Sequence, residues 1–475
     1  MKTNILFLFF NFLLIIFLSS CSDNSTNPNK NTEAISGKVT LVGQNDHSGV
    51  TVSLYQPITL DTALVRINQL YPNIGVQISQ ETEFDHREYN AVASTTTTSD
   101  GSWGFENVAS GNYNLVVTKD GYGWQYRYTV NSGSFTFELS PTILQKEILT
   151  GNIVWESGKT YMLEGDVYLE AGAAITIQDN VWCLAKQNSR LIVDGKIIKN
   201  SPGFAHFTRD ASNTGIWRGI EVRTSENTLK GIIIDKATIA ISSKNSTMNH
   251  IENAIIRDAS SIGISLSQNI SQHTIKNVLL TGNTVGIEVA DADSTNIISK
   301  TVIFGSDQEG ILMNQSNIEV SNNIIRKNLL GIKCWFLSDA AISNNLIKDN
   351  LSVGIEVSGC KPIITYNNIV LNAAPAINIT AQGYNTQSQP VIRHNNMSTM
   401  SPYIIQIYGT IASNNGLDID ATNNWWSTTD IAMINDIIFD KNDIDPSNTN
   451  NYPNTGYILY LPILSSEEPS AGISN

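Results

Sequence analysis

Charged residues are scarce in this chain of 475 residues, since Lys, Arg, Asp and Glu make up only 15% of it. The 43 acidic residues outnumber the 29 basic ones, which gives a formal net charge of -14. No run of Lys and Arg occurs in the sequence. Because nucleic-acid phosphates are bound through clustered Lys and Arg, this composition argues against a nucleic-acid-binding protein.

Cysteine and histidine are also rare, at four and six residues. Cys183, Cys334 and Cys360 lack the spacing of a zinc site and do not make a disulfide framework, so we expect them to be small buried hydrophobic residues. The histidines lack metal-ligand spacing and are expected in loops or on the surface. They are His47, His86, His206, His250, His273 and His394. The scarcity of these residues therefore predicts no metal site built from Cys and His, and no cofactor apart from the Ca²⁺ considered below.

Only one long apolar run is present, from Ile5 to Leu18, broken by Asn11. It is too short to span a hydrocarbon core of about 30 Å, and Lys2 precedes it as in a signal peptide. The run ends in Leu18-Ser19-Ser20-Cys21, which resembles the lipobox of bacterial lipoproteins. The alternative is an ordinary cleaved signal peptide with a chance cysteine.

The lipobox resemblance implies that residues 1–20 are removed and that Cys21 is lipidated and anchors the protein in a membrane. Ser22 at the next position implies the outer membrane or cell surface of a Gram-negative bacterium. Residues 21–34 would then be the lipidated cysteine and a flexible polar tether.

Residues 35–140 alternate between apolar and polar side chains with period 2, as strands do, and are interrupted by turns that contain Gly. Two motifs follow each other here: Ser99-Asp100-Gly101-Ser102-Trp103-Gly104-Phe105 and Gly111-Asn112-Tyr113-Asn114-Leu115-Val116-Val117. They resemble the carboxypeptidase regulatory-like family of small Ig-like sandwiches related to transthyretin, with Gly121-Tyr122 as the closing pair. The resemblance implies a spacer or docking module without chemistry of its own.

Two features of this region remain open. The stretch from Gln56 to Ala93 is longer than the family's usual connection, and its residues 60–70 carry Leu and Ile at helical spacing, which predicts a short helix. Trp103 and Trp124 either bind a ligand or pack in the core or at its rim.

A fixed repeat dominates residues 150–430. Gly-Ile recurs at steps of 21–24 residues from Gly263 through Gly286, Gly310, Gly331 and Gly354, and Ala376-Ile377 continues the series. This is the length of one coil of a parallel β-helix, and leucine-rich repeats are excluded because their Leu spacing is missing. We therefore predict an all-β protein: a small Ig-like β-sandwich followed by a right-handed parallel β-helix.

Alternate residues of each strand should point inward, so that Ile264 and Leu266 pack on Ile287 and Val289 of the next coil. A second repeat consists of Asn pairs: Asn322-Asn323, Asn344-Asn345, Asn367-Asn368, Asn395-Asn396 and Asn423-Asn424. Asn tolerates the left-handed backbone of tight bends, and its amide can donate to the carbonyl of an Asn in the next coil. We therefore expect an Asn ladder along the axis.

Both ends of the repeat resemble known elements. Residues 161–177 are similar to the opening coils of bacterial surface β-helix proteins of the pectate-lyase-like kind. Residues 423–430 resemble a terminal N-N-W-W-G-T-T-D element, with Ser427 in place of Gly. Trp425 and Trp426 either form a sugar platform or cover the last coil, and residues 431–475 are expected to form a C-terminal cap and tail.

Proteins of this fold include lyases, epimerases and adhesins, so the fold alone selects no activity. The outward position of the Gly-Ile strands carries Ser265, Glu288, Leu312, Lys333, Glu356 and Asn378 on successive coils. Lys333, Glu356 and Glu288 are the catalytic candidates, because a lyase needs a base beside a uronate and a cation such as Arg223 to neutralise its carboxylate. A solvated Lys333–Glu356 ion pair is the alternative. Glu288 with Asp291 and Asp293 could bind Ca²⁺, or these Asp residues could simply form turns.

The sequence favours a non-catalytic, lipid-anchored envelope protein whose β-helix binds a polysaccharide or a surface protein. The alternative is a polysaccharide lyase or epimerase that acts on uronate-containing glycans.

Overall fold

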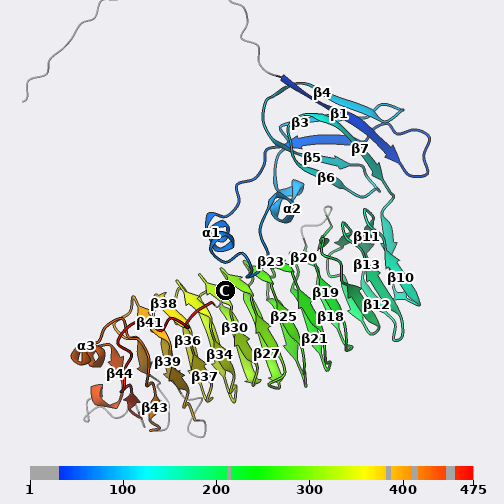
Figure 1. Cartoon of the computed structure of the whole chain (residues 1–475). Helices are drawn as coiled ribbons and strands as arrows, with labels where there is room; N and C mark the ends of the chain where they lie inside the picture. Colours follow the sequence, from blue (N-terminus) through cyan, green and yellow to red (C-terminus); the bar gives the residue numbers. More distant parts are fainter. Residues whose placement is uncertain (1–31, 211–214, 381–386, 409–415, 445–454, 474–475) are drawn as a thin grey trace, which may run out of the picture.

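The computed structural model describes residues 32–210, 215–380, 387–408, 416–444 and 455–473. It is almost entirely β-structure, with a small N-terminal part placed at one end of a long solenoid (Figure 1). The helical elements are α1 (Thr62–Leu70), α2 (Gln80–Glu83), η1 (His86–Glu88), α3 (Ile431–Asp436) and η2 (Lys441–Asp443). Within the described residues no helix is long and apolar enough to cross a membrane. The predicted signal segment and Cys21 lie outside the described ranges.

The N-terminal part consists of two small sheets that share one hydrophobic core. The first has the order β4 (Ser102–Ala109), β1 (Thr32–Leu41), β7 (Gly133–Leu139). The second has the order β3 (Ala93–Thr96), β2 (Thr51–Tyr55), β5 (Tyr113–Thr118), β6 (Gln125–Val130). Inward residues of both sheets, such as Val39 and Leu115, are fully buried, because period-2 alternation places every second side chain on the shared face.

The solenoid is a right-handed parallel β-helix with three sheets. Sheet 1 contains β10 (Asn152–Trp155), β13 (Ala174–Ile177), β16 (Lys196–Lys199), β19 (Thr228–Lys230), β22 (His250–Glu252), β25 (Thr274–Lys276), β28 (Ile297–Ser299), β31 (Glu319–Ser321), β34 (Ala341–Ser343), β37 (Ile363–Thr365), β40 (Val391–Arg393), β43 (Ile419–Asp420) and β45 (Ile458–Leu459).

Sheet 2 contains β8 (Ile143–Gln145), β11 (Thr160–Leu163), β14 (Trp182–Ala185), β17 (Ala205–Arg209), β20 (Ile232–Asp235), β23 (Ile255–Arg257), β26 (Leu279–Thr281), β29 (Val302–Phe304), β32 (Ile324–Arg326), β35 (Leu346–Lys348), β38 (Asn368–Asn372) and β41 (Asn396–Thr399). Sheet 3 contains β9 (Ile148–Leu149), β12 (Asp166–Leu169), β15 (Arg190–Val193), β18 (Gly219–Val222), β21 (Ile239–Lys244), β24 (Ile262–Ser267), β27 (Val285–Ala292), β30 (Glu309–Ser316), β33 (Leu330–Trp335), β36 (Ile355–Ser358), β39 (Ile377–Thr380), β42 (Ile405–Ile407) and β44 (Ile438–Phe439).

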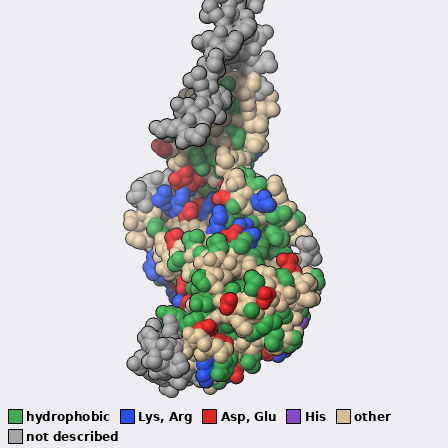
Figure 2. All heavy atoms as spheres, turned by 90° about the vertical axis from the view of Figure 1, so that its left-hand side faces the viewer, with side chains coloured by type: hydrophobic (Ala, Val, Ile, Leu, Met, Phe, Trp, Pro, Cys, Tyr) green, Lys and Arg blue, Asp and Glu red, His purple; other side chains and the backbone are tan. Residues whose placement is uncertain are grey.

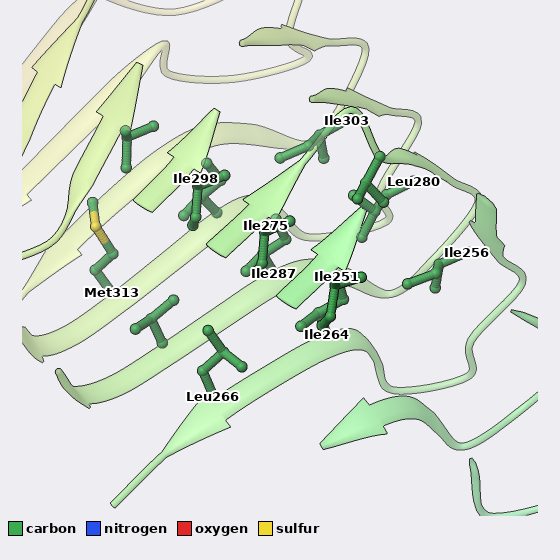
Figure 3. Close-up of a cluster of buried hydrophobic side chains, with 14 of the residues drawn as sticks. Ile251, Ile256, Ile264, Leu266, Ile275, Leu280, Ile287, Ile298, Ile303 and Met313 are labelled. Atoms are coloured by element: carbon green, nitrogen blue, oxygen red, sulfur yellow. The ribbon is translucent and has the colours of Figure 1, made fainter. Parts of the chain in front are cut away.

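The core of the β-helix is a set of apolar stacks, one residue per coil (Figure 3). Ile264 pairs with Ile287 and Leu266 with Val289 in adjacent strands, and all four are buried, which confirms the predicted inward register. Each fully buried Ile or Val contributes roughly 1.5–3 kcal/mol relative to an exposed one. Identical stacks in every coil therefore make one continuous core.

The predicted Asn ladder is present, with a correction to its phase. Each rung accepts from the backbone N–H and the side-chain amide of the preceding rung, as where Asn323 donates twice to Asn345 Oδ1 at 2.9 and 3.0 Å. The rungs are Asn323, Asn345, Asn367, Asn395 and Asn424. The rung is thus the second Asn of some pairs and the first of others. The residue before each rung, from Asn322 to Asn423, has the left-handed backbone expected at a tight bend.

A second ladder, which we did not predict, follows β32, β35 and β38 at another corner. Asn328 donates twice to Asn350 Oδ1, and Asn350 donates twice to Asn372 Oδ1, at distances from 2.9 to 3.1 Å. This ladder has room only because the Gly-Ile repeat places a Gly, which has no side chain, beside each of its Asn amides. A Cβ on Gly331 would lie 2.4 Å from the carbonyl oxygen of Gly354 and 3.1 Å from the amide nitrogen of Asn350.

Replacing Gly331 by Ala is therefore expected to destabilise the β-helix by about 3 kcal/mol. This is the upper end of the usual cost of overpacking an interior, because the 2.4 Å contact is with a backbone carbonyl, which cannot rotate away. Gly305→Ala is the control, because its Cβ would meet nothing within 4 Å and only its left-handed backbone resists substitution, at about 1–2 kcal/mol. Thermal unfolding of both variants measures the difference. A Gly331→Ala protein as stable as the control would contradict the packing argument.

The long connection between β2 and β3 docks the N-terminal part onto the β-helix. Leu64 and Ile67 of α1, together with Ile74 and Val76, pack on the outer face of sheet 2 at β20, β23, β26 and β29 (Figure 1). The short helix predicted near residues 60–70 is confirmed as α1, capped by the Asp61 carboxylate. This explains why the connection is long: it covers an apolar surface that a sheet of this kind otherwise leaves exposed.

Charged side chains complete the same junction. Arg87 donates to Thr208 Oγ1 at 2.9 Å and to the carbonyl of Arg209, and Arg257 lies 3.0 Å from Glu83 Oε2. Lys236 pairs with Glu88. Figure 2 shows basic and acidic side chains side by side at the level where the two parts of the molecule meet.

The C-terminal segment closes the solenoid and then turns back along it. β45 and β44 extend sheets 1 and 3, and Ile434 of α3 is buried in the last coil. The chain then runs back over sheet 2, where Glu468 N–H donates to Asn396 Oδ1 and Gly472 N–H donates to the carbonyl of Tyr366. Its Ile473 packs against the same apolar cluster as α1.

Candidate functional site

The outward positions of sheet 3 form one straight row. Strand pairing places the predicted residues on successive coils in the order Glu221, Ser242, Ser265, Glu288, Leu312, Lys333, Glu356 and Asn378. The row is therefore as the sequence predicted, with Ser242 supplying the step between the early and middle coils.

Lys333, a member of this row, stands between two carboxylates. Its Nζ lies 3.5 Å from Glu309 Oε1 and 3.4 Å from Glu356 Oε1, and 5.7 Å from the centre of the Trp335 ring. The predicted Lys333–Glu356 pair is thus present, and Glu309, which we had not considered, completes a triad. The three side chains are between 16% and 27% exposed, so the triad is accessible but partly shielded.

The coil that carries Lys333 also has an unusual corner. Phe336 and Leu337 both have a left-handed backbone, with φ of 38° and 57°. Neighbouring coils place Asp291, Gln315 and Gly359 at the position of Phe336, and Asp and Gly are better suited to positive φ. A bulky residue held there costs of order 1–3 kcal/mol. Single bulky residues with positive φ also occur at other corners, such as Tyr366 and Leu371, so this corner is distinguished by two consecutive apolar ones that are both exposed.

Hydrogen bonds on both sides hold this corner in place. The N–H groups of Phe336 and Leu337 donate to the carbonyls of Ser358 and Gly359, and the carbonyl of Phe336 accepts from Gln315. Trp335, Phe336 and Leu337 remain 36%, 36% and 55% exposed. We call these three residues the apolar corner. Sequence reasoning missed it, although three bulky residues stand here where other coils have small or polar ones.

The lyase pair that we considered is not assembled. Arg223 follows β18, whereas Lys333 lies on β33, five coils further along the row. At about 4.8 Å per strand the two coils are roughly 24 Å apart. Arg223 instead pairs with Glu221 at 2.8 Å, and Arg190 with Glu221 at 2.5 Å. Although burial opposes it, hydrogen bonding to Arg223 and the positive charges of both Arg residues lower the pKa of Glu221.

The Ca²⁺ candidates form turns. Asp293 Oδ1 accepts hydrogen bonds from the backbone and hydroxyl of Thr295, and Asp291 has the left-handed backbone of a bend. Glu288 accepts from Ser265 at 3.3 Å. Across the described parts of the chain, no group of three His, Cys, Asp or Glu side chains is placed to hold a metal ion.

The tryptophans that we considered as binding residues lie in different surroundings. Trp426 is 1% exposed and packs in the solenoid core, edge-on to Tyr460, whereas Trp425 is partly exposed. Trp103 is buried in the N-terminal core. Trp124 lies at the junction, with the guanidinium of Arg87 5.1 Å from its ring centre.

Cys183, Cys334 and Cys360 are buried free thiols, as predicted. Burial raises the pKa of the Cys183 thiol. The expectation of surface histidines is wrong for His273, which is 2% exposed, lies at the corner just before β25 and donates its backbone N–H to Asn296 Oδ1. His86 and His206 are partly exposed, but they lie within the domain junction and pack against Trp124 and Trp182. The residue type alone could not reveal this, because burial there depends on contacts between distant segments.

Residues 218–329 and 268–426 match the family model described as a right handed beta helix region. No curated protein sequence matches the chain. Among solved structures, the chain is similar to the A-module of mannuronan C-5 epimerase AlgE4 from Azotobacter vinelandii, with 13% identity, 68% of this chain and 91% of that chain covered, and a TM-score of 0.40. It is also similar to pectate lyase Pel9A, with 15% identity, coverage of 59% and 80%, and a TM-score of 0.31. The catalytic domain of a GH87 alpha-1,3-glucanase gives 11% identity, coverage of 90% for both chains and a TM-score of 0.40. At these values the structures carry no argument about activity.

Proposed function

We propose that this protein is a lipid-anchored envelope protein of a Gram-negative bacterium that binds a polysaccharide on sheet 3, at the apolar corner and the Lys333 triad. In this proposal Cys21 carries the lipid, the N-terminal part is a carboxypeptidase regulatory-like spacer, and the β-helix is a non-catalytic binding rod. The lipobox-like sequence supports the anchor, and the two small sheets with a shared core are compatible with the spacer.

The single observation that carries the binding site is the strained apolar corner. An exposed aromatic ring can stack on the apolar face of a pyranose, while nearby charged side chains bind its hydroxyl groups. Trp335 and the Glu309–Lys333–Glu356 triad provide both kinds of contact side by side. No structural requirement of the coil calls for Phe336 and Leu337, because Gly or Asn would satisfy the same backbone with less strain.

A glycan array tests this proposal, using the chain with Cys21→Ser so that it stays in solution. We expect the bound glycans to lose about 5- to 150-fold in affinity in Trp335→Ala, since removal of one aromatic stacking contact costs about 1–3 kcal/mol where nucleic-acid bases stack on aromatic side chains. Phe336→Gly with Leu337→Gly should weaken binding while raising stability by about 1–2 kcal/mol through relief of strain. Ile363→Ala, an exposed residue of sheet 1, is the control. Unchanged binding in Trp335→Ala would contradict the proposed site.

A polysaccharide lyase or epimerase acting on uronate-containing glycans is the second candidate, and the accessible Lys333 triad is the observation that favours it. Treatment of polyuronates, with and without Ca²⁺, distinguishes the two. Ultraviolet absorbance of unsaturated products, absent with Lys333→Ala, would replace the binding proposal by the lyase.

A further inference from the structure

A cavity of about 250 Å³ lies where the N-terminal part meets the first coils of the β-helix. Trp124, Tyr126 and Tyr128 line it from the side of β6, and Trp182 and His206 line it from β14 and β17. Glu81 of α2 forms part of its rim. The cavity exists only because the two parts are docked, so neither part contains this site alone.

One wall of the cavity is a column of four stacked rings that crosses the junction. Tyr128 stacks on Tyr126 with ring centres 5.7 Å apart, Tyr126 on Trp182 at 5.3 Å, and Trp182 on His206 at 4.2 Å. The planes of successive rings differ by no more than 22°. The Tyr126 hydroxyl lies 2.7 Å from His86 Nδ1, which fixes the column from behind. The wall is therefore rigid, and its shape is present before any ligand binds.

Some polar side chains around the cavity have no hydrogen-bond partner among the described residues. They are those of Glu81, Tyr128, Ser157 and Asn180, all of which line it. Buried polar groups are usually satisfied within the protein, whereas polar groups in a cleft that point to solvent are available to a ligand.

The charge of the cavity indicates what kind of ligand fits. Glu81 is its acidic side chain and Arg127 its basic one, so these charges balance. Burial lowers the pKa of His206 to about 3, which leaves it neutral at neutral pH. A phosphate or carboxylate ligand would require an excess of cationic groups, which these residues do not supply.

We propose that this junction cavity binds one neutral sugar residue. The volume accommodates a single pyranose ring, and Trp124, which stands outside the column, can contact its C–H groups. The hydroxyl, amide and carboxylate groups that have no partner among the described residues can bind its hydroxyls. The site is separate from the apolar corner, which lies on β33, far along the solenoid from β14. It adds a second carbohydrate contact at the end of the rod that is nearer the N-terminus.

The experiment is calorimetric titration of the full chain carrying Cys21→Ser with methyl glucopyranoside, methyl mannopyranoside and N-acetylglucosamine. We expect at least one of them to bind, with affinity about 3- to 10-fold weaker in Tyr128→Phe, which removes only a hydroxyl and keeps the ring stack. Trp124→Ala should weaken binding more than tenfold. Thermal unfolding of each variant verifies that the junction is intact.

Trp335→Ala is the matched control, because it changes the apolar corner and leaves the junction cavity untouched. Binding that is lost in Trp335→Ala and unchanged in Tyr128→Phe would overturn the junction site while supporting the corner. Absence of binding to all three sugars at millimolar concentration would also overturn it. Sugar binding that is weakened by Tyr128→Phe and unchanged by Trp335→Ala supports the junction site, whatever the outcome of the glycan array at the apolar corner.

Discussion

Replacing Asn345 by Leu is expected to lower the stability of the β-helix by about 3–5 kcal/mol, at about 1–3 kcal/mol for each buried polar group left without a partner. Asn345 is fully buried in the middle of the first ladder. Its Oδ1 accepts from the backbone N–H and the amide of Asn323, and its own amide donates to the carbonyl of Val320 and to Asn367 Oδ1.

A leucine at this position removes every one of these side-chain contacts. The Asn323 N–H loses its acceptor and the Val320 carbonyl loses a donor, in a core from which water is excluded. Each rung of the ladder accepts a hydrogen bond from the backbone of the preceding coil. One substitution therefore disturbs two coils.

Asn378→Leu is the matched control, because Asn378 lies on the outward row of sheet 3, is partly exposed and accepts a hydrogen bond from Gln406 Nε2 at 2.9 Å. Loss of one such hydrogen bond costs about 0.5–1.5 kcal/mol. Differential scanning calorimetry and hydrogen exchange of β31 and β34 measure the effect, since a repeat protein need not unfold in one step. Equal stability of the two variants would show that the ladder contributes little.

Acidification from pH 7 to pH 4 is expected to weaken the junction between the N-terminal part and the β-helix by several kcal/mol. Burial lowers the pKa of His86 to about 4 and that of His206 to about 3. His86 faces Asp85 and Arg87 and makes edge-to-face contacts with Tyr55, Trp124 and Tyr126, whereas His206 stacks on Trp182.

The direction of the effect follows from the protons bound. An undocked, solvent-exposed histidine has a pKa of about 6.5. Below that pH it binds a proton, whereas the docked histidine stays neutral, so the docked state loses stability as the pH falls. Each pKa unit corresponds to about 1.4 kcal/mol, which gives about 3 kcal/mol per histidine at pH 4. Further acidification acts through Asp85. Burial opposes the ionisation of its carboxyl group, but the hydrogen bonds and charge of Arg87 lower its pKa to about 2. The stability that Asp85 contributes is therefore lost between pH 4 and pH 2.

Hydrogen exchange of β6 and β14 at pH values between 4 and 7, corrected for intrinsic rates, measures this loosening. His86→Phe with His206→Phe should remove most of the pH dependence, because phenylalanine keeps an aromatic ring without a titrating nitrogen. His250→Gln, an exposed residue of β22, should leave it unchanged. Protection that stays constant from pH 7 to pH 4 in the original chain would contradict the burial of these histidines.

The two repeats show which features of the fold can be predicted from the period of the sequence. The Gly-Ile steps predicted the inward stack of Ile264 on Ile287, since the period of the strand decides which side chains face the core. The Asn pairs predicted a ladder, but its phase shifted by one residue between Asn345 and Asn367. A pair of identical residues does not reveal which member turns inward, because that depends on where the preceding strand ends.

The candidate site was less accessible to prediction. The row through Glu288, Lys333 and Glu356 followed from strand alternation, and the structure has it. Glu309 was not predicted as part of the site, because it contacts Lys333 from a different position along the adjacent strand. The apolar corner was visible only as three bulky residues, and its left-handed backbone became apparent only when the coils were placed one above the other.

The sequence by itself determined the all-β class, the repeat length, the inward register and the buried character of the cysteines, because each of these depends on local period or on a residue type that recurs in every coil. Only the tertiary structure decided where residues 56–92 lie, that Tyr126, Trp182 and His206 form one column, and that a cavity opens beside them. These features join segments dozens of residues apart that share no period, and their contact is favoured by apolar surface that neither part can bury alone.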